Sequence, residues 1–585
     1  MSRLRTLLAT CLGIVVIATL STACGLLPDA GPVHRQDSTS DTSGADQTYF
    51  YPPGPNPGAD RVSIAKGFLV AMEANPLNTA AARAFLSEHA GSSWTPSGGT
   101  IVYDGSSVTQ KGATTLMRLS GAHRVDAAGV WQRGPAHRIT VHLKMTREHG
   151  EWRIENPSSA LVVKSSYFQA RFAAYQLYFF DRGNRVLVPE TVYAPDGQLT
   201  ASTLVRGLLV GPEPRLATVA HSALPTGTTL DPSVVVTDRG VAEVPLSADI
   251  LKLSPSERSQ ALVELAWTLQ QVPGIQQVRV TVDGSPLTLS DGRTEVGADD
   301  GAEFAPTGLG PTRDLIGIRN GRVVTISGRT ASPVAGAFGK RGLLLRSLAL
   351  ERSGRRIVGV AQNGTIAFTG ASVDQARVRR MFTGTDLLRP RIDGSGTVWL
   401  VDRTSQGAVV HAIRHGHARV VRLPGISGQP VNSFAISPDG TRFAAGIDSG
   451  IRPRVVVDVL RRTAAGSPTR GSGSISLPIT SYDPSHKLGP VVDLGWRTPT
   501  MLAVLTRPTD GTSRVVYAVD DGSPGNLTDT EPDAFQGKAV DLVVNPDNDT
   551  PLMLVDASGR LERLDTAGKW EAAGVTGLIA ATYAD

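Results

Sequence analysis

The chain has 585 residues, of which 41% are hydrophobic, and its 58 Lys and Arg exceed its 53 Asp and Glu to give a formal net charge of +5. The basic residues are spread along the sequence without a dense block, which argues against nucleic acid as a partner. Composition is that of a globular protein, and the length suffices for about three domains of ~100 to 200 residues.

The N-terminus has the pattern of an export signal. Arg3 and Arg5 precede an apolar stretch at 7–20 (LLATCLGIVVIATL), which is short for a membrane span. No later apolar run approaches the ~18 residues of a spanning helix, so we expect the rest of the chain to lie outside the membrane. Two alternatives remain open for this segment, an ordinary secretory peptide and an uncleaved anchor.

Small residues follow the apolar stretch and lead to a cysteine. The sequence at 21–24 (STAC) resembles the lipobox of bacterial lipoproteins, with Ser21 where that motif prefers Leu. The resemblance implies cleavage after Ala23, which would leave residues 1–23 as the signal peptide, and attachment of lipid, such as palmitate, to the sulfur of Cys24. Because Cys11 would be removed with the signal, we expect no internal disulfide and no cysteine-rich metal site in the mature chain.

Residues 24–60 are rich in Pro, Gly, Ser, Thr and Asp and show no apolar period. Such a composition favours a flexible tether. About 35 residues of flexible chain would span roughly 30 to 35 Å, enough to lift a domain off lipid headgroups.

Residues 61–170 read as short helices followed by strands. Apolar residues recur at helical spacing from Val62 to Met72, and alternating stretches follow at 136–145 and around Trp152. Two helices leading into a meander resemble the NTF2-like cone domains of exported lipoproteins, which can hold a small ligand. No acid and base pair indicates catalysis there, and we interpret the scattered histidines as surface or strand-face residues: His137, His142 and His149.

Residues 175–290 predict an α/β module. A helix over 204–210 ends at Gly211-Pro212, and Ser254-Pro255-Ser256-Glu257 combines a capping box with proline at the first helical position. The ordered segments LYFF, LVPE, LLVGP, LPTGT and VRVTVDG resemble the GerMN domain of spore-germination and cell-envelope proteins. That resemblance implies a small interaction module without catalytic residues. We assign structural or solvated roles to its carboxylates near turns: Glu190, Glu243 and Asp283.

Residues 305–585 predict a β-propeller. Pairs of apolar strands around a polar turn recur every ~40 to 60 residues, close to the length of a four-stranded blade. Two segments, 314–327 and 577–583, are left at the ends and could complete a sixth blade, so we predict about six blades, with seven as the alternative. We expect 467–476 (SPTRGSGSIS) to form a long loop. The recurrent pairs lie at 347–360, 390–401, 433–445, 493–505 and 541–555.

Motifs that would indicate an enzyme are missing from the sequence. It contains no G-x-S-x-G, H-E-x-x-H, Walker or G-x-G-x-x-G motif, and we predict no cofactor, no metal site and no catalytic residue. Residues 393–399 (DGSGTVW) match the Asp-box of glycosidase propellers only in part, and we favour a structural turn. We interpret His415-Gly416-His417 as a charged loop and not a metal site.

The order of lipobox, tether, NTF2-like domain, GerMN domain and propeller resembles the actinobacterial lipoprotein LpqB family over nearly the whole chain. This resemblance implies a lipid-anchored protein on the extracytoplasmic face of the cell membrane. It also implies an accessory role beside the Mtr sensor histidine kinase of a two-component system, in cell-envelope homeostasis and division. The alternative is an envelope glycan-processing enzyme or a small-ligand-binding lipoprotein.

Overall fold

The computed structural model describes residues 50–584, apart from 97, 309–313, 341, 449, 451–452, 482, 484, 526–530 and 548–549. The expected signal peptide, Ala23, Cys24 and most of the expected tether lie outside the described residues. Three regions follow one another in the described part: an N-terminal region (50–171), a middle region (172–304) and a propeller (315–584).

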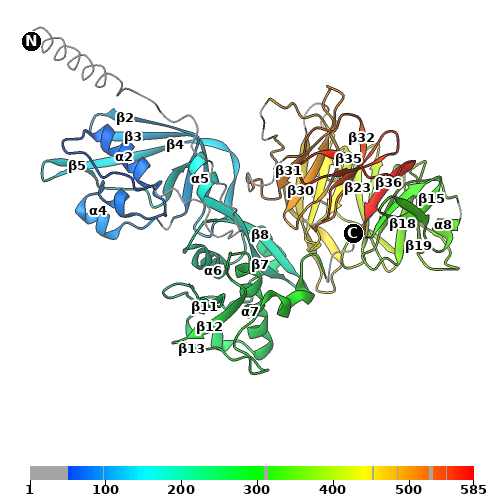
Figure 1. The fold of residues 1–585 in the computed structure, drawn as a ribbon, viewed down its shortest axis with the longest axis horizontal. Helices are drawn as coiled ribbons and strands as arrows, with labels where there is room; N and C mark the ends of the chain where they lie inside the picture. Colours follow the sequence, from blue (N-terminus) through cyan, green and yellow to red (C-terminus); the bar gives the residue numbers. More distant parts are fainter. Residues whose placement is uncertain are drawn as a thin grey trace, which may run out of the picture. The chain divides into compact units, whose positions relative to one another are not determined.

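The N-terminal region packs short helices on a sheet, as the sequence predicted. Asp60 caps α2 (Arg61–Ala71) by accepting from the Ser63 amide at 2.7 Å, and Ile64 and Phe68 bury one face of this helix. The sheet runs in the order β5-β4-β3-β1-β6, and β1 and β6 are parallel, which a simple meander would not give. In Figure 1 helix α2 is blue, and the strands run from blue to cyan. Its remaining elements are α3 (Ala80–Arg83), α4 (Glu88–Ser93), β1 (Thr100–Tyr103), β2 (Gly105–Lys111), β3 (Thr114–Val125), β4 (Trp131–Glu148), β5 (Glu151–Ile154), β6 (Leu161–Lys164) and α5 (Ser165–Arg171).

The middle region places helix α7 (Pro255–Leu269) against two small sheets. The predicted capping box is present: the Glu257 amide donates to Ser254 Oγ at 3.4 Å, and the Ser254 amide donates to Glu257 Oε2 at 2.8 Å. The sheets have the orders β8-β7-β9 and β10-β11-β12-β13. Other elements are β7 (Phe172–Asp181), β8 (Leu187–Pro195), α6 (Thr200–Val210), η1 (Leu216–Thr218), β9 (Ala220–His221), β10 (Val235–Val236), β11 (Val241–Pro245), η2 (Ala248–Lys252), β12 (Gln277–Val282), β13 (Ser285–Pro286) and η3 (Ala298–Phe304).

In the described part of the propeller, six antiparallel sheets follow one another, five of four strands and one of three. The first sheet has the order β16-β15-β14-β36, so the last strand of the chain, β36 (Leu578–Tyr583), becomes the innermost strand of the first blade. Its pairing with β14 (Leu315–Arg319), which joins Tyr583 to Leu315, closes the ring as predicted. Figure 1 shows β36 in red near the green strands of the first blades.

Each predicted strand pair forms the two inner strands of one of the later blades. The prediction of a loop at 467–476 was wrong, because β28 (Pro468–Leu477) pairs with the long strand β27 (Arg454–Arg462). Backbone hydrogen bonds to a nine-residue neighbour hold this Ser- and Gly-rich segment in the sheet despite its low strand propensity. The remaining elements are β15 (Arg322–Ser327), β16 (Thr330–Pro333), α8 (Ala337–Lys340), β17 (Leu345–Leu350), β18 (Arg356–Ala361), β19 (Ile366–Ala371), β20 (Arg379–Thr383), β21 (Arg391–Ile392), β22 (Val398–Thr404), β23 (Gly407–Arg414), β24 (His417–Val420), β25 (Val431–Ile436), β26 (Arg442–Ile447), β29 (Val491–Trp496), β30 (Met501–Thr506), β31 (Arg514–Val519), β32 (Ala539–Val543), β33 (Met553–Asp556), β34 (Leu561–Leu564) and β35 (Trp570–Ala572).

Candidate functional site at the domain junction

A buried arginine joins the propeller to the middle region. Arg442, the first residue of β26, is 3% exposed and makes ion pairs with Asp439 Oδ2 at 2.8 Å and Asp520 Oδ2 at 2.5 Å. Its guanidinium also donates to the carbonyl oxygen of Pro189 in β8. One side chain therefore connects the fourth blade, the end of the fifth blade and the middle region, and its charge is offset where water is excluded.

Other contacts extend this junction. The hydroxyls of Thr218 and Ser472 lie 3.0 Å apart, and the Gly525 amide donates to the Tyr193 hydroxyl at 3.0 Å. Val459 of the propeller belongs to the apolar core of the middle region. Strand β28 thus supplies part of the contact surface at the place where a loop was expected. Together these contacts join the two regions through both apolar and polar groups.

The junction also contains a buried carboxyl group, that of Glu190. This side chain is 5% exposed, and its two carboxyl oxygens accept from the Glu213 amide at 3.1 and 3.3 Å. Burial, and next the charge of Glu213, raise the pKa of Glu190 to about 8. Glu190 is therefore mainly protonated at neutral pH, and alkaline conditions would add a negative charge to a buried interface.

Two arginines close the axis of the propeller. Arg391 donates to the carbonyl oxygens of Phe434 at 3.1 Å and Leu494 at 3.2 Å, which lie on the innermost strands of the next two blades. Arg389 pairs with Asp493 at 3.5 Å and with Asp541. Arg391 thus supplies donors to carbonyl groups on the inner strands, and Arg389 offsets the charge of two carboxylates there.

The two carboxylates at this axis, Asp493 and Asp541, accept hydrogen bonds from backbone amides of neighbouring strands. Asp493 accepts from the Leu542 amide at 3.1 Å, and Asp541 accepts from the Ala581 amide at 2.9 Å. A general acid or nucleophile needs a carboxyl group that can reach a substrate. Through these hydrogen bonds and the ion pairs with Arg389, the two carboxylates connect neighbouring blades.

The carboxylates singled out from the middle-region sequence lie in three different environments. Glu190 belongs to the junction, whereas Glu243 on β11 pairs with Arg279 at 2.9 Å. Asp283 occupies a turn with φ of 48°, before Gly284. The interpretation of structural or solvated roles is confirmed for Glu243.

The motif at 393–399 forms a structural turn. Asp393 accepts from the Ser395 amide at 2.9 Å, the Thr397 amide at 3.1 Å and the indole of Trp399 at 2.8 Å. Burial alone would raise the pKa of Asp393, but pairing with Arg462 at 2.7 Å and these donors hold it below its usual value. The carboxylate thus fixes a turn and pairs with the next blade.

The histidines of the sequence analysis do not gather into a site. His137 and His142 lie on β4, and His149 follows it in a turn with φ of 53°. His415 occupies the turn between β23 and β24 with φ of 50°, as predicted, whereas His417 is the first residue of β24 and not part of a loop. Among the described residues, no group of three or more His, Cys, Asp or Glu side chains is placed to hold a metal ion.

Arg442 and Glu264 are examples of buried charged groups that were not predicted from sequence. Arg442 looked like an ordinary residue after a turn, and nothing in its neighbourhood indicates the distant partner Pro189. Glu264 of α7 is 0% exposed, accepts from the Ala223 amide at 2.6 Å, and burial raises its pKa to about 8. Its place between apolar positions of one helix, Leu262 and Leu265, is the signal that could have found it.

None of the helices in the described ranges combines the length and apolarity needed to cross a membrane.

Three families match successive parts of the chain. Residues 54–169 match the N-terminal domain of lipoprotein LpqB, 176–288 match the family described as "Sporulation and spore germination", and 321–573 match the LpqB beta-propeller domain. Two solved structures align with parts of the chain. The first GerMN domain of GerM from Bacillus subtilis is 22% identical, with 22% of this chain and 95% of that chain covered and a TM-score of 0.18. Streptogramin B lyase is 11% identical, with 39% and 68% covered and a TM-score of 0.27.

Curated relatives named "Lipoprotein LpqB" align with most of the chain. The Cutibacterium acnes protein is 25% identical over 579 residues, which cover 94% of this chain and 95% of that protein. The Streptomyces coelicolor protein is 26% identical over 602 residues, with 96% and 94% covered. The Mycolicibacterium smegmatis protein is 28% identical over 490 residues, with 74% and 80% covered. The domain order and these relatives together show that the chain belongs to the actinobacterial LpqB lipoprotein family, a group of membrane-anchored envelope proteins.

Proposed function

We propose that this protein is an accessory regulator of an Mtr-type sensor kinase, held by lipid on Cys24 at the extracytoplasmic face of the membrane. Family membership and the sequence at 21–24 support the anchor. In this proposal, cleavage after Ala23 leaves residues 24–60 as a tether, followed by the domains 61–170, 175–290 and 305–585. The role is cell-envelope homeostasis and division.

The observation that carries the proposal is the Arg442 junction. Asp439 and Asp520 hold Arg442 in the propeller, and Arg442 fixes the middle region by donating to the Pro189 carbonyl, so that a partner meets one composite surface. The carboxylates on the propeller axis already serve the fold. The composite surface and the engaged carboxylates therefore favour a binding role over a hydrolytic role.

The anchor would act through effective concentration. Confinement to the membrane plane raises the frequency with which the protein meets a membrane-bound kinase, without strong intrinsic affinity. Stable anchoring requires more than one acyl chain, which lipoprotein modification provides.

In-cell crosslinking with mass spectrometry tests this proposal, with Cys24→Ser as the variant and Cys11→Ser as the matched control. We expect crosslinks between the protein and the extracytoplasmic domain of the kinase in wild type and Cys11→Ser, and their loss in Cys24→Ser at equal exported abundance. Equal signalling by Cys24→Ser would contradict the anchoring role. Hydrolysis of wall polymer by the purified protein would favour the enzyme alternative.

A further inference from the structure

The third and fourth blades of the propeller carry neighbouring segments that contain arginine but no acidic residue. Two stretches of the sequence, 403–438 and 459–482, hold seven arginines and no Asp or Glu. They include β24 and β28, which are the outermost strands of these two blades. The fold therefore brings two basic segments together at the outer rim of the propeller.

Three of these arginines form a row across paired strands, which we call the arginine row. Arg461 of β27 lies opposite Arg470 of β28, and Arg470 also pairs with Arg422, which follows β24. The Gly471 amide donates to the Arg422 carbonyl oxygen at 2.9 Å and fixes this register. Residues opposite each other in an antiparallel pair project from the same face, with Cβ atoms about 4.5 to 5.5 Å apart, and like charges placed so are destabilising. An anion on this face would relieve that repulsion.

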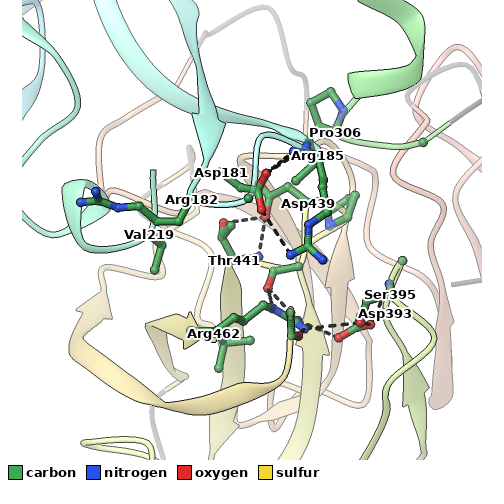
Figure 2. A pocket seen from close by; sticks show the side chains of 18 of the residues that line it. Asp181, Arg182, Arg185, Val219, Pro306, Asp393, Ser395, Asp439, Thr441 and Arg462 are labelled. Atoms are coloured by element: carbon green, nitrogen blue, oxygen red, sulfur yellow. Dashed lines mark hydrogen bonds and ion pairs between the residues drawn. The ribbon is translucent and has the colours of Figure 1, made fainter. Parts of the chain in front are cut away.

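Carboxylates offset other arginines of the same stretches but not the arginine row. Arg462 pairs with Asp393 at 2.7 Å, as Figure 2 shows, and Arg403 pairs with Asp386 at 2.5 Å. Within the part of the chain that the structure describes, the guanidinium groups of the arginine row have no ion pair and no hydrogen bond. Their charge is therefore available to a partner outside the chain.

The one acidic residue on the two paired strands does not reach the surface. Asp458 is the single carboxylate of β27 and β28, is 0% exposed, and accepts from the Gly473 amide at 3.0 Å. Arg422 and Arg470 are exposed and Arg461 is half-buried. The cations thus face solvent while the carboxylate stays inside the blade.

An exposed valine accompanies the cations. Val420 of β24 is 52% exposed, and the guanidinium of Arg419 beside it also has no partner among the described residues. Arginine binds phosphate oxygens, and apolar carbon next to it can enter the boundary between headgroups and acyl chains. A place on two outermost strands suits a flat partner better than a compact ligand. Charge and exposed carbon together therefore match the surface of an anionic bilayer.

We propose that the arginine row and Arg419 dock on the anionic phospholipid headgroups of the bilayer that anchors the protein. The proposal rests on the lipid anchor of the proposed function and not on the kinase partnership. If fully extended, residues 24–49 would span up to about 90 Å, so the anchor permits the propeller to reach the headgroups. Docking would hold the propeller in one orientation on the membrane.

Energy transfer between the propeller and labelled headgroups tests the proposal. The lipidated full-length protein is reconstituted in vesicles of phosphatidylcholine, or of phosphatidylcholine and phosphatidylglycerol at three to one. Ala418→Cys, an exposed position of β24 next to Arg419, carries a fluorescent donor, and a trace of labelled lipid carries the acceptor. Co-flotation with the neutral vesicles verifies the anchor separately, and its absence would contradict the proposed function.

The rim variant is Arg422→Gln with Arg470→Gln. Its matched control is Arg322→Gln with Arg329→Gln, two exposed arginines of the first blade that also lack an ion pair among the described residues. The two variants lose the same formal charge, so they separate the rim from net charge. A third variant, Arg422→Lys with Arg470→Lys, keeps the charge, and thermal melting verifies that each protein is folded.

We expect more energy transfer in the anionic vesicles than in the neutral ones at 50 mM salt, and loss of the difference at 500 mM salt. One basic residue near an anionic bilayer changes its partition by about fivefold, so the rim variant should lower the ratio of docked to undocked propeller roughly 30-fold. The control and the lysine variant should keep the difference between the two vesicles.

Equal transfer in the two vesicles for an anchored wild type would overturn the proposal. So would a folded rim variant that keeps the difference, or a control that loses it to the same extent. If anionic lipid has no effect but the rim variant loses in-cell crosslinks to a protein, the rim binds an acidic protein surface and the lipid proposal is wrong.

Discussion

Replacement of Arg442 by Met tests the junction most severely. The variant removes the guanidinium but keeps most of the side-chain volume, and it leaves Asp439 and Asp520 without their cation and the Pro189 carbonyl without its donor. Breaking a buried ion pair by removing one partner costs about 3 to 5 kcal/mol. We expect this cost to appear as opening of the junction, because the hydrogen bond to Pro189 is lost and two buried carboxylates beside it are left without their cation.

Hydrogen exchange by mass spectrometry measures that opening. Peptides that cover β8 and the start of β26 should lose protection by roughly 140- to 3,700-fold, the equivalent of the expected free energy. Arg380→Met, an exposed substitution on β20, is the matched control and should stay within about 0.5 kcal/mol of wild type. A loss below about 1 kcal/mol in Arg442→Met would refute the reasoning.

The pH dependence of the Arg442→Met defect supplies a second readout. Burial raises the pKa of Asp520 to about 7 even beside Arg442, so Asp520 without that cation should be protonated at pH 6. The defect should therefore grow from pH 6 to pH 8. Adding Asp520→Asn to Arg442→Met should reduce the defect at pH 8, because the unpaired charge is gone.

Three further predictions follow from other parts of the fold. Wild type should lose stability as pH rises from about 4.5 toward about 8, because Glu190 keeps its proton in the folded chain and releases it when the chain unfolds. Glu190→Gln should make the free energy of unfolding, measured by denaturant titration, less dependent on pH. An unchanged dependence on pH would contradict a protonated Glu190 in the folded protein. Ser254→Ala should cost about 1 kcal/mol of the stability of α7, measured by exchange of its first amides, whereas Ser256→Ala should cost less. Deletion of 578–585 should remove the strand that closes the propeller ring and produce aggregation in light scattering; a monodisperse, folded product would show that closure by β36 is dispensable.

Local sequence patterns predicted the elements whose partners are close in the chain. The inner strands β25 and β26 flank a turn in which Asp439 and Gly440 supply the required geometry, and the sequence alone indicates such a hairpin. The capping box at Ser254 is equally local. Closure by β36 was inferred from the strand count, since an open ring would expose edges.

One prediction failed where low strand propensity concealed a local pairing, and others were not made where partners are distant in sequence. The segment 467–476 has low strand propensity, and pairing with β27 decides its conformation. Arg442 meets Pro189, which is 253 residues away, and Asp520 in the next blade.

A disulfide across the junction tests the central structural claim most directly. The hydroxyls of Thr218 and Ser472 lie 3.0 Å apart, and neither of the native cysteines, Cys11 and Cys24, belongs to the middle region or the propeller. In the full-length protein, Thr218→Cys with Ser472→Cys should form an intramolecular disulfide under mild oxidation, detected by peptide mass mapping. Thr218→Cys with Ser405→Cys, an exposed position in the turn after β22, should not. Equal yields from the two pairs, or no disulfide in the first, would contradict a junction fixed in the observed register.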